Sequence, residues 1–141
     1  MNSNTKHITP IQIRFNDIDI AGHTNNAIYM EYSDLAKMHY FNDVFKNTIN
    51  WKEKGFVLAH ISLDYVEPIY LKEEIIVETT TQKIGEKSIE ILQILRLKNS
   101  KDDKDIKCII NSVMVAYHYI EKQSIILSDK WIASLKKFEE K

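Results

Sequence analysis

The chain has 141 residues, 44% of them hydrophobic, and its 19 Lys and Arg residues nearly balance its 20 Asp and Glu residues for a net charge of −1. This length is typical of one domain, so we expect residues 1–141 to form a single unit. The near-neutral charge argues against nucleic-acid binding, which normally needs a basic face. No apolar run approaches the roughly 20 residues that span a bilayer.

The N-terminal sequence and the cysteine content bear on location. Residues 1–7 lack the apolar core of a signal peptide. Cys108 is the only cysteine, which rules out an internal disulfide and fits a reducing compartment. We therefore expect a cytoplasmic protein.

The first third of the chain predicts a strand, a polar loop and a long helix. Apolar and polar residues alternate over residues 8–15, which indicates a strand, and the polar loop covers residues 17–24. Residues 26–45 predict the helix, and a short helical segment is expected over residues 47–54.

The long helix is apolar over most of its surface, so we expect other structure to surround it. Thr24 or Asn25 would cap its N-terminus. The apolar surface is expected to comprise Ile28, Tyr32, Leu35 and His39, widened by Met30, Met38, Phe41 and Phe45. The polar residues form only a narrow stripe of Glu31, Asp34, Lys37 and Asn42.

The rest of the chain predicts four strands and a second helix. The strands are expected over residues 56–67, 73–84, 87–98 and 107–120. A charged run over residues 99–107 indicates a solvated loop, and residues 128–140 form an amphipathic helix with Ser128 as its cap. The order β-α-β-β-β-β-α predicts an α+β domain in which a curved antiparallel sheet wraps around the early helix.

The stretch "DIDIAGHTNN", residues 17–26, concentrates polar chemistry directly before that helix. Taken singly, Asp17 and Asp19 are ordinary turn residues, His23 is an ordinary hydrogen-bonding loop residue, and Gly22 marks a positive φ. Together they place a carboxylate beside a helix start, whose unpaired N–H groups and dipole favour a carbonyl oxygen that gains negative charge. Asp19 there could attack the carbonyl carbon or activate water against it, which indicates acyl-transfer chemistry.

Other catalytic and cofactor motifs are absent from the sequence. It has no Gly-x-Ser-x-Gly elbow and no phosphate-binding loop. His60, Cys108 and His118 are scattered without the spacing of metal ligands, so we read them as structural. We expect neither a metal nor a cofactor.

Residues 13–37, "IRFNDIDIAGHTNNAIYMEYSDLAK", closely resemble the active-site signature of the 4-hydroxybenzoyl-CoA thioesterase-like branch of the hotdog superfamily. That signature has an Arg, two alternate Asp residues, Gly-His-x-Asn-Asn, a Tyr three residues later, and then an acidic and a basic residue in the helix. The element order extends the resemblance, more loosely, to about residue 120. The resemblance implies a hotdog fold and hydrolysis of an acyl-CoA or acyl-carrier-protein thioester.

The resemblance also implies roles for individual residues. Asp19 would be the catalytic carboxylate, with Gly22 and His23 shaping the turn behind it. The backbone N–H near Asn26 would polarise the thioester carbonyl. The catalytic residues implied are Asp19, His23 and Asn26, and the substrate-binding residues implied are Gly22, Asn25, Tyr29 and Lys87, the last near the CoA phosphates.

This chain departs from the family pattern at three places. Asp34 and Lys37 stand where Glu and Arg are commoner in the helix. Lys72 and Glu73 replace a Gly-Asp pair, and residues 85–86 stand where some relatives place arginines. The last difference affects the expected contacts with CoA phosphates and leaves the thioester chemistry untouched.

Two alternative functions remain open on the sequence. A hotdog hydratase or dehydratase also uses an acidic residue and a His, but its signature separates them by four residues with an Asn-Pro between, whereas three residues separate Asp19 from His23 here. The other alternative is a non-catalytic protein that binds acyl thioesters. In each case the resemblance implies a homodimer, or a dimer of dimers, with each site built from two subunits.

Overall fold

The computed structural model describes residues 7–100 and 105–140. Its elements are β1 (His7–Ile11), the 3-10 helix η1 (Phe15–Asp17), α1 (Ile28–Phe45), β2 (Lys54–Tyr65), β3 (Ile75–Ile84), β4 (Ser88–Leu97), β5 (Ile106–His118), β6 (Gln123–Ser124) and α2 (Asp129–Glu139). Residues 1–6, on which the signal-peptide prediction rests, and residues 101–104 of the charged run lie outside the described residues, so both predictions stay untested.

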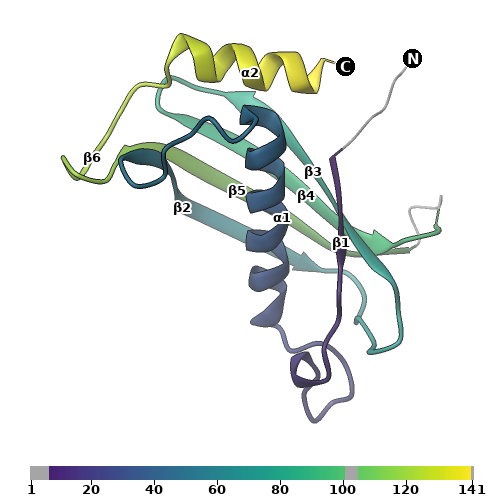
Figure 1. The fold of residues 1–141 in the computed structure, drawn as a ribbon. Helices are drawn as coiled ribbons and strands as arrows, with labels where there is room; N and C mark the ends of the chain where they lie inside the picture. Colours follow the sequence, from purple (N-terminus) through teal and green to yellow (C-terminus); the bar gives the residue numbers. More distant parts are fainter. Residues whose placement is uncertain (1–6, 101–104, 141) are drawn as a thin grey trace.

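The strands form one antiparallel sheet in the order β1-β3-β4-β5-β2, with the short β6 paired to the end of β5. β1 and β2 are therefore its two edge strands. Figure 1 shows α1 lying across one face of the sheet and α2 crossing the end at which α1 finishes. The predicted antiparallel sheet with an early and a late helix is confirmed.

One expected element is absent, and one observed element was not expected. The helical segment expected over residues 47–54 is absent, because Lys46 and Asn47 adopt positive φ angles of 52° and 58° after the end of α1. The chain then turns at Asn50, whose carbonyl accepts from the N–H groups of Glu53 and Lys54, and β2 begins at once. The two-residue β6 was also not predicted.

The buried face of α1 is rotated from the predicted one. Leu35 and Met38, expected in the core, are 40% and 50% exposed. Ser33 and Ala36 are completely buried instead, and the Ser33 hydroxyl donates to the Gln93 side chain on β4 (2.5 Å). Because these two residues are small, the sheet packs closely against this face of the helix.

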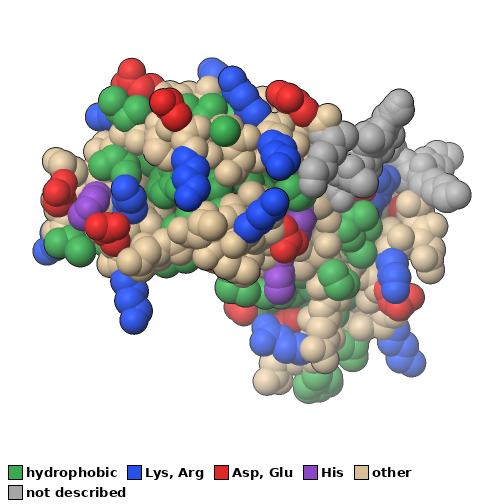
Figure 2. Space-filling view, turned by 45° about the horizontal axis from the view of Figure 1, so that its top comes forward, with side chains coloured by type: hydrophobic (Ala, Val, Ile, Leu, Met, Phe, Trp, Pro, Cys, Tyr) green, Lys and Arg blue, Asp and Glu red, His purple; other side chains and the backbone are tan. Residues whose placement is uncertain are grey.

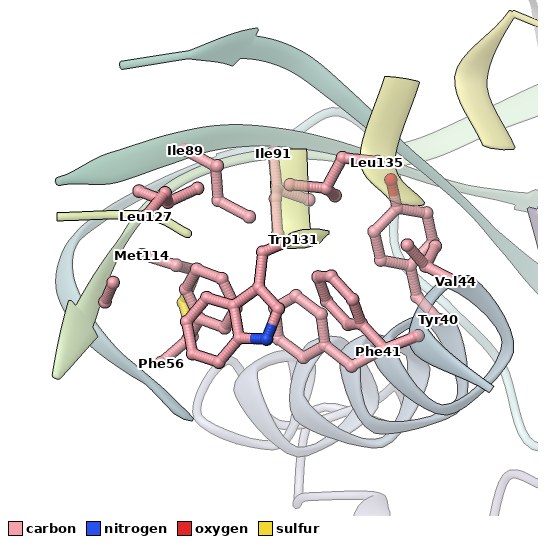
Figure 3. Packing of buried hydrophobic residues seen from close by; sticks show 12 residues of the cluster. Tyr40, Phe41, Val44, Phe56, Ile89, Ile91, Met114, Leu127, Trp131 and Leu135 are labelled. Carbon is pink, nitrogen blue, oxygen red and sulfur yellow. The ribbon is translucent and has the colours of Figure 1, made fainter. Parts of the chain in front are cut away.

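The core beside α2 is built from aromatic rings contributed by three elements. Figure 3 shows Trp131 of α2 among Phe41 of α1, Phe56 of β2 and aliphatic side chains of β4 and β5. The ring centroids of Trp131 and Phe56 are 4.9 Å apart, and those of Phe41 and Phe56 are 5.1 Å apart and stacked. The predicted cap of α2 is confirmed, since the Ser128 hydroxyl accepts from the Trp131 N–H (3.1 Å).

Neither helix of the described part of the chain combines the length and the apolar character that a membrane span requires.

Candidate active site

The loop before α1 folds into a tight turn that begins at Asp19. The Asp19 N–H donates to the His23 carbonyl (3.1 Å), and the Gly22 N–H donates to the Asp19 carbonyl (3.0 Å). The Asp19 Oδ1 accepts from the Ala21 N–H (2.9 Å). Gly22 has a φ of 89°, which other residues rarely adopt, so the predicted positive φ is confirmed. A backbone N–H of the turn, that of Ala21, thus holds the half-buried Asp19 carboxylate in place.

Asp17, the other carboxylate of the motif, has a different environment. Its side chain is 1% exposed and accepts from the Arg14 backbone N–H (3.0 Å), the Arg14 guanidinium (2.9 and 3.2 Å) and the Tyr32 hydroxyl (2.7 Å). Burial alone would raise the pKa of the Asp17 carboxyl, but these hydrogen bonds lower it below its ordinary value. The Asp17 carbonyl also accepts from the Asn25 N–H (2.8 Å). Asp17 therefore anchors the loop to α1.

Replacing Asp17 by Asn is expected to lower the free energy of unfolding by about 2 kcal/mol at neutral pH, because the buried charge-assisted hydrogen bonds are lost. Since the pKa of Asp17 in the folded protein lies below its ordinary 3.8, its stabilising effect is present above that value and is lost as the pH falls further. In urea unfolding, the difference in free energy of unfolding between the native protein and Asp17→Asn should therefore be smaller at about pH 3 than at neutral pH. An equal difference at the two pH values would contradict an ionised Asp17 carboxylate in this anchor.

The segment after β2 packs against this loop. The Thr24 N–H donates to the Ile69 carbonyl (2.8 Å), and the ring of His23 meets the ring of Tyr70 edge-on at 6.2 Å. Lys107 fixes the segment from the side of β5, because its buried ammonium donates to the Pro68 carbonyl (3.1 Å) and to Glu73 (3.0 Å). The loop is thus held on a rigid support.

A hollow of about 140 Å³ opens between the loop, the start of α1 and the end of β2. The predicted site residues His23, Asn26 and Tyr29 line one side of it, and residues 65–68 line the other. The Tyr65 ring meets Tyr29 edge-on at 5.0 Å, and its hydroxyl donates to the Asn26 carbonyl (3.1 Å). Burial raises the pKa of Tyr29 to about 12, so at neutral pH its hydroxyl stays protonated.

The start of α1 leaves an amide group available at this hollow. Asn25 forms a turn before the helix, with its Oδ1 accepting from the Ala27 N–H (2.9 Å) and its carbonyl from the Ile28 N–H (2.9 Å). The N-cap of α1 is Ala27, so the predicted capping by Thr24 or Asn25 is wrong by two or three positions. Within the described residues, the N–H of Asn26 donates no hydrogen bond. This N–H and the helix dipole together favour a partly negative oxygen at this point.

Lys87 is the one predicted site residue that lies far from this turn. Its neighbour Ser88 pairs with Val115, which pairs with Val57 near the start of β2. The turn lies at the other end of β2, beside Tyr65. Eight residues of strand separate these ends, which corresponds to about 26 Å. Within one protomer, therefore, Lys87 does not reach the site.

Charge on the face around α2 is mixed. Figure 2 shows Lys and Arg side chains interspersed with Asp and Glu over this side of the molecule. This agrees with the net charge of −1 for the whole chain. The face in view therefore offers no extended basic surface.

The sequence did not identify the second wall of the hollow. Its residues 65–68 belong to "DYVEPIY", a stretch with two aromatic residues around a proline. That pattern indicates a rigid turn, but it does not show that the turn lies against the loop before α1, where the Ile69 carbonyl accepts from the Thr24 N–H and the Tyr65 hydroxyl donates to the Asn26 carbonyl. The anchor formed by Arg14, Asp17 and Tyr32 was also missed, because Tyr32 reaches Asp17 from the second turn of α1, fifteen positions further along the chain.

The family model of the thioesterase-like superfamily matches residues 13–132. No curated protein shows a significant match to the sequence.

Among solved structures, a thioesterase from Thermus thermophilus complexed with coenzyme A and Zn has a TM-score of 0.82 at 23% identity, covering 95% of this chain and 94% of that one. The PA5185 protein of Pseudomonas aeruginosa has a TM-score of 0.83 at 22% identity, covering 94% and 91%. Slr0204, a 1,4-dihydroxy-2-naphthoyl-CoA thioesterase from Synechocystis, has a TM-score of 0.77 at 15% identity, covering 92% and 95%. These similarities concern the fold. The family match, which covers most of the sequence, shows that the chain belongs to the thioesterase-like superfamily.

Proposed function

We propose that this chain is a hotdog-fold thioesterase that hydrolyses an acyl-CoA, or an acyl-carrier-protein thioester, to a free acid and a thiol. The observation that carries the proposal is the arrangement at the start of α1. The Asn26 N–H, which has no partner in the described chain, adjoins a hollow there, and the Asp19 carboxylate, which does not line this hollow, is fixed by its own turn in the loop before the helix. The membership of the thioesterase-like superfamily supports the same reaction.

The proposed reaction needs two functions from this site. The thioester carbonyl lies in the hollow, and its oxygen accepts from the Asn26 N–H, so the helix start stabilises the charge that develops on that oxygen. Asp19 supplies the attack on the carbonyl carbon. The C–S bond then breaks, the thiolate takes a proton and leaves as the thiol, and the acyl group leaves as the free acid with one oxygen from water.

Two routes for Asp19 are chemically competent, and incorporation of ¹⁸O into the Asp19 carboxylate would identify the first of them. As a nucleophile, Asp19 forms an anhydride that water then cleaves. As a general base, it removes a proton from water, which attacks the carbonyl directly. After one turnover in ¹⁸O-labelled water, the general-base route leaves no label in the peptide that contains Asp19. The anhydride route labels that carboxylate if water attacks its own carbonyl carbon.

We also propose that the protein is a homodimer whose sites are shared between subunits. β2 is a 12-residue edge strand with Leu58 39% exposed, and exposed Leu35 and Met38 lie on α1. An open edge of this length, next to apolar surface, favours pairing with a second copy. The distance of Lys87 from the turn in its own protomer supports a shared site, since a two-fold axis could carry it to the partner's turn.

Product analysis separates the proposed function from its alternatives. Acyl-CoA and crotonyl-CoA are incubated with the full chain, and thiol release, free acid and hydration of the crotonyl double bond are each measured. A thioesterase releases thiol and acid in equal amounts and leaves the double bond intact. Hydration without thiol release would support a hydratase, and binding without either product would support a non-catalytic protein.

Replacing His23 by Ala is expected to lower kcat about tenfold, less than the loss expected for a group that transfers the proton. The ring of His23 lines the hollow and packs on Tyr70, whereas the turn uses only the His23 carbonyl, which Ala retains. The matched control is His39→Ala on the exposed side of α1, which should leave kcat unchanged. If His23→Ala lost as much activity as Asp19→Asn, the imidazole would have to be the general base.

A further inference from the structure

A second hollow, of about 430 Å³, lies beside α1 near the start of β2. Its walls are mostly apolar and include Met38, Phe41, Trp51 and Phe56. A volume of this size falls within the range of about 300–1,000 Å³ that is usual for small-molecule sites. The hollow is open in the protomer and lies on the same side of α1 as β2.

A buried ammonium group lies in this apolar wall. Lys37 is 4% exposed, and its Nζ has no hydrogen-bond partner within the described residues. Asp34, one turn earlier, lines the same hollow but forms no ion pair with Lys37. Burial lowers the pKa of the Lys37 ammonium, and the Asp34 carboxylate opposes only part of this effect. A buried ammonium without a partner is costly, so its position indicates that another molecule supplies an acceptor.

The two hollows lie beside the same two elements, α1 and β2, at different points along them. The first contains Tyr29 and Tyr65, and the second contains Lys37 and Phe56, so both use the same helix and the same strand. Eight residues of helix separate Tyr29 from Lys37, which corresponds to about 12 Å. An extended acyl chain of roughly ten carbons covers this distance, since each bond of about 1.5 Å advances the chain by a little less than its length.

We propose that Lys37 selects acyl groups that end in a carboxylate, which its ammonium binds at the far end of the space between α1 and β2. This inference rests on the proposed function, because the thioester carbonyl is taken to lie at the start of α1. The chain between the two ends would contact apolar residues such as Met38, Phe41 and Phe56. A methyl end would leave the ammonium unpaired, whereas a carboxylate offers it charge-assisted hydrogen bonds. The preferred substrate class is therefore the monothioester of a dicarboxylic acid of about this length.

Two thioether analogues of CoA test the proposal without depending on catalysis, since a methylene group replaces the thioester carbonyl and nothing can be hydrolysed. One carries a decyl chain, and the other carries the same chain ending in a carboxylate. Calorimetric titration of the full chain should show the carboxylate-ended analogue binding about tenfold more tightly, as expected for a charged hydrogen-bonded pair. A native protein that binds both equally, or binds neither, would overturn the proposal.

Three variants assign the effect to the ammonium. Lys37→Met should remove the preference or reverse it, whereas Lys37→Arg, which keeps the charge, should retain it. Lys136→Met, on the exposed side of α2, should behave as native. Sedimentation is measured in parallel. If Lys37→Met weakened both analogues equally and also split the oligomer, the ammonium would be paired with a second copy of the chain and the proposal would be wrong.

The test distinguishes the two proposals from each other. If the native protein hydrolyses no thioester but shows the Lys37-dependent preference, the proposed function fails and the acyl selection stands. If it hydrolyses decanoyl-CoA and the decanedioyl monothioester with equal kcat/KM, the function stands and the selection fails. If both proposals are right, Lys37→Met lowers kcat/KM for the carboxylate-ended substrate about tenfold relative to kcat/KM for decanoyl-CoA.

Discussion

Replacing Asp19 by Asn is expected to lower the rate of thioester hydrolysis about a hundredfold or more, while folding and ligand binding stay largely intact. Asn has the same shape, and its Oδ1 still accepts from the Ala21 N–H, so the turn is retained. Both chemical roles open to the carboxylate are lost, since a neutral amide is neither a nucleophile nor a base. The measurement is kcat/KM from thiol release, with thermal unfolding and binding of a CoA thioether measured on the same sample.

Asp17→Asn is the matched control for this experiment. The two residues lie two positions apart, but Asp17 is buried in the Arg14–Tyr32 anchor and Asp19 lies in the half-exposed turn. Asp17→Asn should therefore lose stability and keep most of its activity at temperatures where it is folded. Asp19→Asn should do the reverse. Turnover at the native level in Asp19→Asn would contradict the role proposed for this carboxylate.

Mixing two impaired variants is expected to raise activity above that of either one if the site is shared between subunits. Asp19→Asn and Lys87→Glu chains are unfolded together and refolded. In each mixed dimer one site carries both changes and the other carries neither. Random assembly makes half of the dimers mixed, so activity should return to roughly a quarter of the native value at low substrate concentration. No recovery in verified mixed dimers would contradict the shared site, and an active monomer would contradict the dimer itself.

Lys87→Ala tests independently whether Lys87 binds a phosphate of CoA. A lysine contributes a point charge to a phosphate, so its loss should raise KM for acyl-CoA severalfold and barely change kcat, with a smaller effect at high salt. Lys98→Ala, at the other end of β4, should change neither constant. A fall in kcat at unchanged KM would mean that Lys87 acts on the reaction rather than on CoA.

Elements of the fold could be predicted from the sequence where apolar residues recur with the period of a strand or a helix. The alternation that predicted β3 and β4 placed both to within two residues of their observed bounds. The helix expected after residue 46 failed because two consecutive residues, Lys46 and Asn47, adopt positive φ, which no periodic pattern indicates. The order of strands in the sheet could not be predicted from local sequence patterns, because β2 pairs with β5 across about forty intervening residues.

The residues proposed for the site come from the sequence motif, whereas their surroundings could not be predicted from it. His23, Asn26 and Tyr29 line the same hollow because all three lie within one loop and the first turn of a helix, and their roles stay predictions. The family resemblance distinguished Asp19 from Asp17 as the catalytic carboxylate, but only the structure shows that Asp17 is buried and accepts from the Tyr32 hydroxyl. Lys37 was expected in the narrow polar stripe of α1. The helix is rotated so that Leu35 is exposed and the side chain of Lys37, including its ammonium, is buried.

Thioester hydrolysis itself is tested most directly by counting the thiol that the native chain releases from a panel of acyl-CoAs. The panel covers short and long aliphatic chains, carboxylate-ended chains, aromatic acyl groups and one acyl-carrier-protein thioester. At least one member should be hydrolysed through many turnovers per protomer, with free acid and thiol formed in equal amounts and with Asp19→Asn nearly inactive on the same substrate. Release at the buffer rate for the whole panel, from a folded protein that still binds a CoA thioether, would contradict the proposed function.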